Sequence, residues 1–192
     1  MPDTARHDMH AVRTTQPGPP ATGRREQSDG LDWVVYVRRL PMPVDEAWEA
    51  LTAPEQLASW VGCWRRDGDA ETGEFTFAYE GDDVLPLSFR VEHLEPRRRV
   101  AVALFDPGEA EPWRLDVALV DWGEETELAV RQSIPNSALA PAVAAGCEFY
   151  LDRLVTMVQG GDMDALDYDA YFLRQAAHYR RLFPVQRSAR DS

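Results

Sequence analysis

Apolar residues along this chain follow two different periods, and the changes between them predict the order of strands and helices. Residues 31–40 are rich in β-branched and aromatic side chains and predict a first strand. The period then lengthens, and apolar residues three and four positions apart predict two short helices over 44–51 and 54–61. One strand and two short helices are therefore expected before the rest of the sheet.

Apolar and polar residues alternate through the middle of the chain, as they do in strands with one buried face. Segments rich in Gly, Pro and Asp separate the alternating stretches at intervals suited to consecutive hairpins. The pattern predicts an antiparallel meander of about five strands, to which the first strand adds a sixth. The predicted strands of the meander cover residues 75–78, 88–93, 100–104, 113–119 and 128–132.

A helical period returns after the meander. Residues 139–158 place their apolar side chains on one stripe, with Glu148, Asp152 and Arg153 off that stripe. This predicts a long amphipathic helix that ends at a pair of glycines. A further helix is predicted over 167–183, where aromatic residues recur on one face and are expected to pack on the rest of the domain.

These elements divide the chain into four parts. Residues 1–30 show no apolar period, so we expect a disordered N-terminal tail that is dispensable for folding. One α+β domain is predicted over 31–161, in which a curved antiparallel sheet of about six strands wraps the long helix. A C-terminal helical extension over 162–184 and a frayed tail over 185–192 follow it.

Composition and charge exclude several kinds of partner. The net charge is −13 and falls on the folded part, which would repel phosphate backbones and anionic lipid, so no nucleic acid or membrane partner is expected. The chain has neither an apolar run long enough to span a bilayer nor a signal-like apolar segment near its start, which favours a cytoplasmic protein. Cys63 and Cys147 lie far apart and are expected to be free thiols.

The opening of the domain resembles a known family. Residues 37–60 read VRRLPMPVDEAWEALTAPEQLASW and are similar to the opening signature of the START-like, polyketide cyclase (SRPBCC) superfamily. Within that superfamily they most resemble the branch named after the heat-shock-protein ATPase activators, and weaker similarity continues to about residue 161. The resemblance implies a helix-grip fold, a sheet wrapped around a long C-terminal helix. One departure is Cys147, where that branch usually has a tryptophan.

The helix-grip fold implies a cavity between sheet and helix, because a sheet bent around one helix leaves volume that side chains do not fill. We therefore predict that the protein binds a small, mainly apolar molecule there, with no cofactor and no metal. The residues expected to contact it lie on inward strand faces, at the end of the second short helix and on the long helix. They are Trp60, Trp64, Phe75, Phe77, Phe89, His93, Trp113, Gln132, Cys147, Tyr150, Leu151 and Leu154.

Two other functions stay open at this point. The resemblance implies that cyclases and dehydratases use the same helix-grip fold. His93, on its predicted inward strand face, is then the candidate acid or base, since histidine titrates near neutrality. Gln132 could bond a ligand carbonyl, and for both residues a satisfied position at the rim is the alternative. A cochaperone-like protein-interaction module is the third function, so a protein partner and the oligomeric state also stay open.

Overall fold

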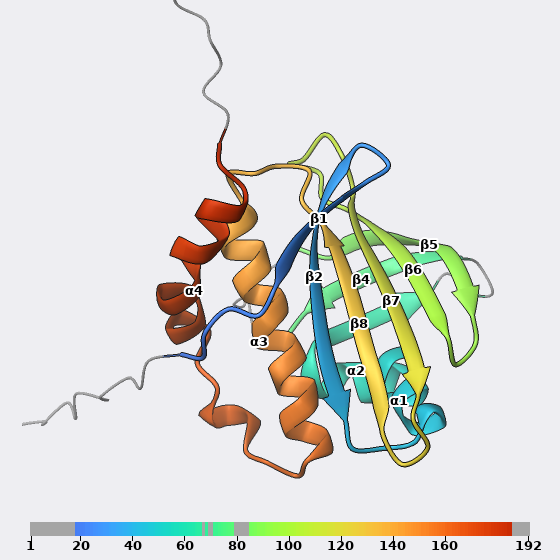
Figure 1. Ribbon diagram of the computed structural model, residues 1–192. Coiled ribbons are helices and arrows are strands. Elements are labelled where there is room, and N and C mark those ends of the chain that lie inside the picture. The colour runs from blue at the N-terminus through green and yellow to red at the C-terminus, as the bar shows by residue number, and fades with distance from the viewer. Residues whose placement is uncertain (1–17, 67, 69–70, 79–84, 186–192) are drawn as a thin grey trace, which may run out of the picture.

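One antiparallel sheet curves around a long helix, α3 (Ala140–Val158), as Figure 1 shows. The computed structural model describes residues 18–66, 68, 71–78 and 85–185. Within these residues the sheet has eight strands in the order β1-β2-β8-β7-β6-β5-β4-β3. The strands are β1 (Arg24–Ser28), β2 (Leu31–Leu40), β3 (Gly62–Arg66), β4 (Thr72–Phe77), β5 (Leu87–Glu95), β6 (Arg99–Phe105), β7 (Trp113–Asp121) and β8 (Thr126–Ser133).

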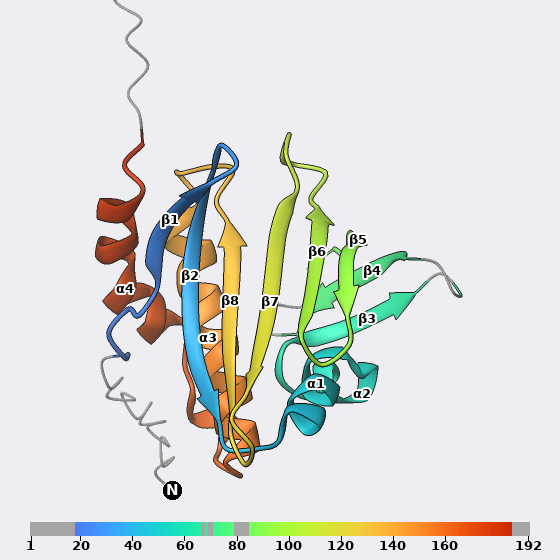
Figure 2. The ribbon, with the colours of Figure 1, turned by 45° about the vertical axis from the view of Figure 1, so that its right-hand side comes forward.

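The remaining helices lie at one end of the sheet and behind α3. Helices α1 (Val44–Thr52) and α2 (Pro54–Trp60) connect β2 to β3 and lie together at one end of the sheet (Figure 2). After α3, a 3-10 turn η1 (Met163–Ala165) leads into α4 (Tyr168–Leu182), which lies on the side of α3 away from the sheet (Figure 1). This order confirms the predicted α+β helix-grip fold.

Strand β3 is the first of two strands that the sequence prediction of about six does not contain. Its five residues, GCWRR, show no alternation of apolar and polar side chains. Gly62 begins the strand with a φ of 152°, and a Cβ there would lie 2.1 Å from the carbonyl oxygen of Thr76 on β4. Glycine is therefore required where the two strands approach so closely.

Strand β1 is the second, and it corrects the prediction of a disordered tail over 1–30. Its side chains are mostly exposed and polar, so the sequence carries no apolar pattern, and backbone pairing with β2 holds it in place. A turn at Asp29 and Gly30, with φ values of 54° and 78°, joins the two strands. The predictions of disorder over 1–17 and of fraying over 186–192 lie outside the described residues.

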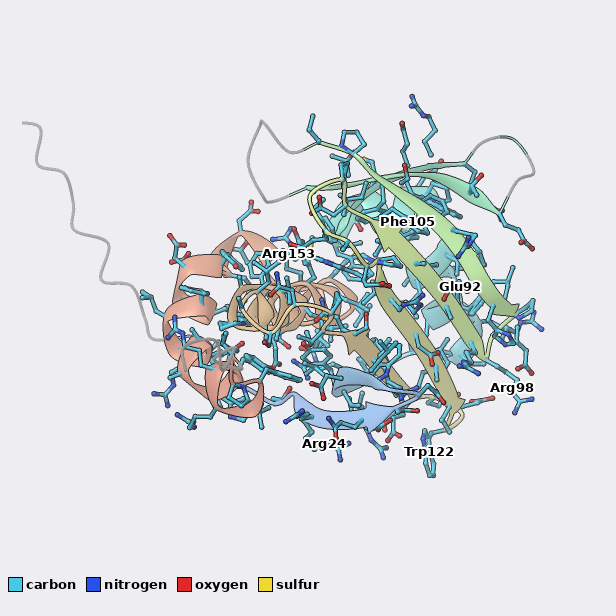
Figure 3. The ribbon with its side chains drawn as sticks, turned by 90° about the horizontal axis from the view of Figure 1, so that it is seen from above. Arg24, Glu92, Arg98, Phe105, Trp122 and Arg153 are labelled. Carbon is cyan, nitrogen blue, oxygen red and sulfur yellow. The ribbon has the colours of Figure 1, made fainter. Side chains whose placement is uncertain are left out.

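Helix α3 is buried on two sides. On the sheet side, Tyr150 stacks on Phe77 of β4 with ring centroids 5.4 Å apart. On the opposite side, α4 contributes the buried rings of Tyr171 and Tyr179, and Phe183 at its C-cap is also buried. Figure 3, seen from above, shows the sheet curving around α3 with α4 beyond it. The last helix is thus part of the folded unit, as its aromatic stripe predicts.

A buried ionic cluster joins α3 to α4, β2 and the segment before β1. Glu148 is 1% exposed and accepts hydrogen bonds from the Thr22 backbone N–H at 2.5 Å and from the Tyr179 hydroxyl. Arg38 of β2 forms ion pairs with Glu148 at 2.6 Å and with Asp152 at 2.8 Å. The sequence pattern correctly places Glu148 off the apolar stripe, but α4 and the N-terminal segment bury that side of the helix.

The protonation state of Glu148 follows from these contacts. Burial alone would raise the pKa of this carboxyl, but hydrogen bonds from Tyr179, Thr22 and Arg38 outweigh it and hold the pKa below its usual range. The carboxylate is therefore charged at neutral pH. Its charge is matched by Arg38, so the cluster satisfies the requirement that buried charges be paired and hydrogen-bonded.

Candidate ligand-binding pocket

A pocket of about 480 Å³ lies between the concave face of the sheet and α3. Side chains of β4, β6, β7 and β8 form one wall, and α3 forms the opposite wall. The pair α1 and α2 and the start of α4 contribute further lining side chains. The volume is in the range of small-molecule sites, and the lining is mostly apolar, as is usual for them.

Small side chains on α3 leave this space open. Val143 lies one turn before the adjacent Gly146 and Cys147, and all three line the pocket. Across from them, Leu115 and Val117 of β7 are only half-buried although they line the pocket on the concave face. A tryptophan at position 147, as in the resembling branch, would occupy part of the space that the cysteine leaves.

Aromatic rings form much of the remaining wall. Tyr150 and Phe77 present their stacked pair to the pocket. The indole of Trp60 is fixed because its Nε1–H donates to a backbone carbonyl of α1 at 3.0 Å. Tyr168, at the start of α4, lines the pocket and donates to a backbone carbonyl of α3 at 3.4 Å. These rings offer flat apolar surfaces whose orientation is set before any ligand arrives.

Polar groups enter the pocket mainly through Gln132 of β8, whose side chain is 5% exposed. The hydroxyl of Tyr36, fully buried on β2, donates to Gln132 Oε1 at 3.0 Å. Burial, with a further contribution from Cys147, raises the pKa of Tyr36 well above its usual value, so this hydroxyl keeps its proton at neutral pH. The pair therefore has a defined donor and a defined acceptor.

Both cysteines are free, as the sequence predicts. Cys63 is exposed on β3, and Cys147 lines the pocket. Burial and the neighbouring charge of Glu148 raise the pKa of Cys147 to about 12. Since the thiolate is the nucleophile, Cys147 shapes the pocket as a small apolar side chain at neutral pH and is poorly suited to attack a ligand.

Many of the residues that the sequence predicts for the site do line this pocket. They come from α2, from the inward faces of β4, β7 and β8, and from α3. They are Trp60, Phe77, Trp113, Gln132, Cys147, Tyr150 and Leu151.

Four other predicted residues lie away from the pocket. Trp64 and Phe89 contact each other with ring centroids 5.5 Å apart, and Phe75 packs edge-on against Phe77. These rings belong to β3, β4 and β5, the strands at one edge of the sheet, and they cover one another there instead of lining the pocket. Leu154 is fully buried in the core.

The prediction that His93 points inward is wrong, because its side chain is exposed. The register of β5 shifts between Val91 and His93, where one step along β6 corresponds to two residues of β5. This bulge pairs His93 with Ala101 of β6, and Ala101 pairs in turn with Asp116 of β7. Asp116 lies on the outer face of the sheet, where it forms an ion pair with Arg99, so His93 lies on the outer face as well. A bulge inverts the alternation of side chains beyond it, and the sequence pattern gives no sign of it here.

Some lining residues are absent from the sequence prediction. Those on β6, β7 and β8 share the inward face of Trp113 or Gln132 and follow from strand alternation. The small residues of α3 carry a weaker signal, and Tyr168 carries none, because its position depends on how α4 docks. The added residues are Leu51, Val61, Leu104, Leu115, Val117, Val130, Ala142, Val143, Gly146, Phe149 and Tyr168.

Among the residues that the structure describes, no group of three or more His, Cys, Asp or Glu side chains is placed to hold a metal ion. Within that part of the chain, no helix has the length and apolar character needed to cross a membrane. The acidic residues Asp162 and Asp167 instead cap η1 and α4 by accepting hydrogen bonds from backbone N–H groups.

Solved structures share this fold. CalU16 from Micromonospora echinospora is 21% identical with a TM-score of 0.66, and the match covers 85% of this chain and 96% of that protein. A protein from Bordetella parapertussis is 18% identical with a TM-score of 0.65, covering 88% and 94%. DynU16, from the dynemicin biosynthetic locus, is 28% identical with a TM-score of 0.57, covering 67% and 48%.

Sequence comparison gives the family. A search of curated proteins found no match. Residues 41–159, however, match the family described as Activator of Hsp90 ATPase homolog 1-like protein. Together with the structural neighbours, this match confirms the resemblance to the START-like (SRPBCC) superfamily and to its branch of heat-shock-protein ATPase activators. Because the match covers more than half of its length, the chain belongs to the Activator of Hsp90 ATPase homolog 1-like family.

Proposed function

We propose that the protein binds a small, mainly apolar molecule in the pocket between the sheet and α3. The observation that carries the proposal is the unfilled space of about 480 Å³ beneath a layer of half-buried apolar side chains. The apolar side chains of Leu115 and Val117 are only partly buried on the pocket wall, which is unfavourable because apolar surface stays exposed to water. An apolar ligand would bury that surface. The fixed rings of Trp60 and Tyr150 supply further area.

The alternative of a cyclase or dehydratase relied on His93 inside the same cavity. The structure instead places this histidine on the exposed side of β5, so it does not face a molecule bound in the pocket. Among the described lining residues, the polar side-chain groups belong to Gln132, to the thiol of Cys147 and to aromatic residues. An amide and a protonated thiol suit recognition better than proton transfer at neutral pH, which supports the proposal of a binding protein.

Filling the pocket should prevent binding. Cys147→Trp places an indole where the small thiol now lines the space. We expect the affinity for Nile Red, an uncharged apolar dye, to fall by more than about tenfold, because the new ring occupies the volume that the dye needs. The thermal unfolding midpoint should stay close to that of the wild type, since the ring enters open space. Dye fluorescence titrations and thermal unfolding of both proteins give the two readings.

Leu173→Trp is the matched control, because Leu173 is 78% exposed on α4 and lies outside the pocket. This variant adds the same indole to the surface and should bind the dye as the wild type does. Unchanged dye binding by Cys147→Trp would place the dye elsewhere and contradict the proposal. Loss of about 1–3 kcal/mol of stability in that variant would mean that the site around Cys147 is already packed, which also contradicts it.

A further inference from the structure

Gly146 leaves a gap on the face of α3 that Tyr168 covers. Both residues line the pocket. Apart from the nearby backbone of α3 and the two chain neighbours of Gly146, a Cβ at this position would have one described atom within 4 Å, Tyr168 Cε2 at 3.8 Å. The pocket therefore extends past α3 at Gly146, and the ring of Tyr168 closes it there.

Tyr168 stands between the pocket and the surface of the molecule. It is the first residue of α4 and is half-buried, whereas its chain neighbours Asp167 and Asp169 are exposed. The side chain therefore starts at the surface and reaches inward to the pocket lining. Rotation of the ring away from Gly146 would connect the pocket to solvent.

The backbone on either side of Tyr168 is held in place. Asp167 caps α4 by accepting a hydrogen bond from the Asp169 backbone N–H at 3.0 Å. Arg153, which is buried on α3, donates to the Met163 carbonyl oxygen of η1 at 3.0 Å. Moving η1 and the start of α4 as a unit would break these hydrogen bonds, so the side chain of Tyr168 is the part that moves at the lowest cost.

The Tyr168 side chain is held by weaker contacts. Its hydroxyl donates to the Ala142 carbonyl oxygen at 3.4 Å, beyond the usual range of about 2.5–3.0 Å for such bonds. Its ring meets Phe149 edge-on with ring centroids 5.9 Å apart. Contacts of this kind hold the ring closed at rest and are broken and re-formed at low cost when a ligand passes.

Two other walls of the pocket are held more firmly. The strands that line it belong to one hydrogen-bonded sheet, so separating two of them would break several backbone hydrogen bonds. On α2, the indole of Trp60 donates to the Ala50 carbonyl oxygen at 3.0 Å and is 6% exposed. The boundary between α3 and Tyr168 therefore opens at a lower cost than either of these walls.

We propose that Tyr168 is the gate of the pocket, and that a small molecule enters and leaves across Gly146 when the Tyr168 side chain turns outward. This rests on the proposed function and adds how access to the same pocket is controlled. A gate sets the barrier for both entry and exit, so removing it changes the association and dissociation rate constants in the same direction.

Stopped-flow fluorescence with Nile Red and the full-length protein measures both rate constants. Tyr168→Ala removes the ring from its place beside Gly146 and should raise both rate constants by about threefold or more. Loss of a contact with the bound dye would instead raise the dissociation rate constant alone, since substitutions within one binding site act mostly on dissociation. The association rate constant is thus the deciding reading.

Trp113→Ala is the matched comparison. Trp113 also lines the pocket with an aromatic ring, but it lies on β7, where hydrogen-bonded strands form the wall. Its removal should raise the dissociation rate constant and leave the association rate constant within about twofold of the wild-type value.

Gly146→Leu tests the passage from the side of α3. A Cβ at this position lies at ordinary contact distance from Tyr168, and leucine is a good helix former, so the variant should fold. Its side chain fills the gap, so both rate constants should fall by about threefold or more. Ala177→Leu is the control, because Ala177 is exposed on α4 outside the pocket, and it should leave both rate constants unchanged.

The possible failures are distinguishable. A Tyr168→Ala variant that raises the dissociation rate constant alone, or changes neither, overturns the gate while binding in the pocket stands. A rise of both rate constants in Trp113→Ala also overturns it, because the entrance then lies on the β7 side. If Gly146→Leu does not fold, the comparison of Tyr168→Ala with Trp113→Ala decides by itself. If Nile Red does not bind the wild-type protein, the proposed function itself fails, and the inference fails with it.

Discussion

Truncating the chain after Gly161 should abolish cooperative folding at room temperature. The truncation removes the buried rings of Tyr171, Tyr179 and Phe183, and burial of a large apolar side chain contributes about 1.5–3 kcal/mol. Three such losses approach the ~5–15 kcal/mol that stabilises a typical domain. The truncation also exposes the side of α3 that α4 covers. Urea unfolding followed by circular dichroism should show no cooperative transition for the truncated chain.

A substitution on the outer face of the same helix provides the control for this truncation. Leu173 is 78% exposed, so Leu173→Ser should change the free energy of unfolding by less than about 0.5 kcal/mol. A truncated chain that unfolds cooperatively at the same urea concentration as the full-length protein would contradict the role assigned to α4.

Replacing Glu148 should be the most damaging single substitution in the ionic cluster. Glu148→Ala leaves Arg38 with Asp152 as its remaining ion-pair partner and removes the acceptor for the Thr22 and Gly23 backbone N–H groups. Because Arg38 keeps Asp152, the cost comes mainly from the buried Thr22, Gly23 and Tyr179 donors that lose their acceptor, at about 1–3 kcal/mol each, so we expect a loss of about 3–5 kcal/mol. Urea unfolding of the variant should show that loss in the free energy of unfolding.

The control is Glu125→Ala, which removes an exposed ion pair with Arg39 and should cost about 0–1 kcal/mol. The pH dependence gives a second reading. Because the folded-state pKa of Glu148 is lowered, its charge stabilises the fold above the unfolded pKa of about 4.3, and this contribution is lost as pH falls through the folded pKa. Glu148→Gln should weaken that acid dependence. An unchanged dependence together with wild-type stability would contradict the structural role of the cluster.

Much of the fold could be predicted from the sequence because most of its strands have one buried and one exposed face. Richness in β-branched and aromatic residues located β2, alternation located β4 to β8, and helical spacing located α1 to α4. The two edge strands escaped prediction for physical reasons. β1 is held by backbone hydrogen bonds and has mostly exposed side chains, and β3 depends on the close approach of Gly62 to β4.

The candidate site was predictable where it depends on one element and unpredictable where it depends on several. Gln132 and Trp113 follow from strand alternation, and Cys147 stands out because it is smaller than the residue the family resemblance implies. Tyr168 and the burial of Glu148 both result from the docking of α4, which no local pattern encodes. His93 was misplaced because a bulge reverses the side-chain alternation of β5.

The most direct test of the central claim is to locate a bound apolar molecule by NMR on the full-length protein with labelled methyl groups. On titration with Nile Red, the methyl signals of Val117, Val130 and Val143 should shift, because these side chains line the pocket. The methyl signals of Val37 and Val120 serve as controls, since both are exposed and lie outside it, and they should not move. Shifts confined to Val37 and Val120, or no shifts at saturating probe, would contradict a ligand site between the sheet and α3.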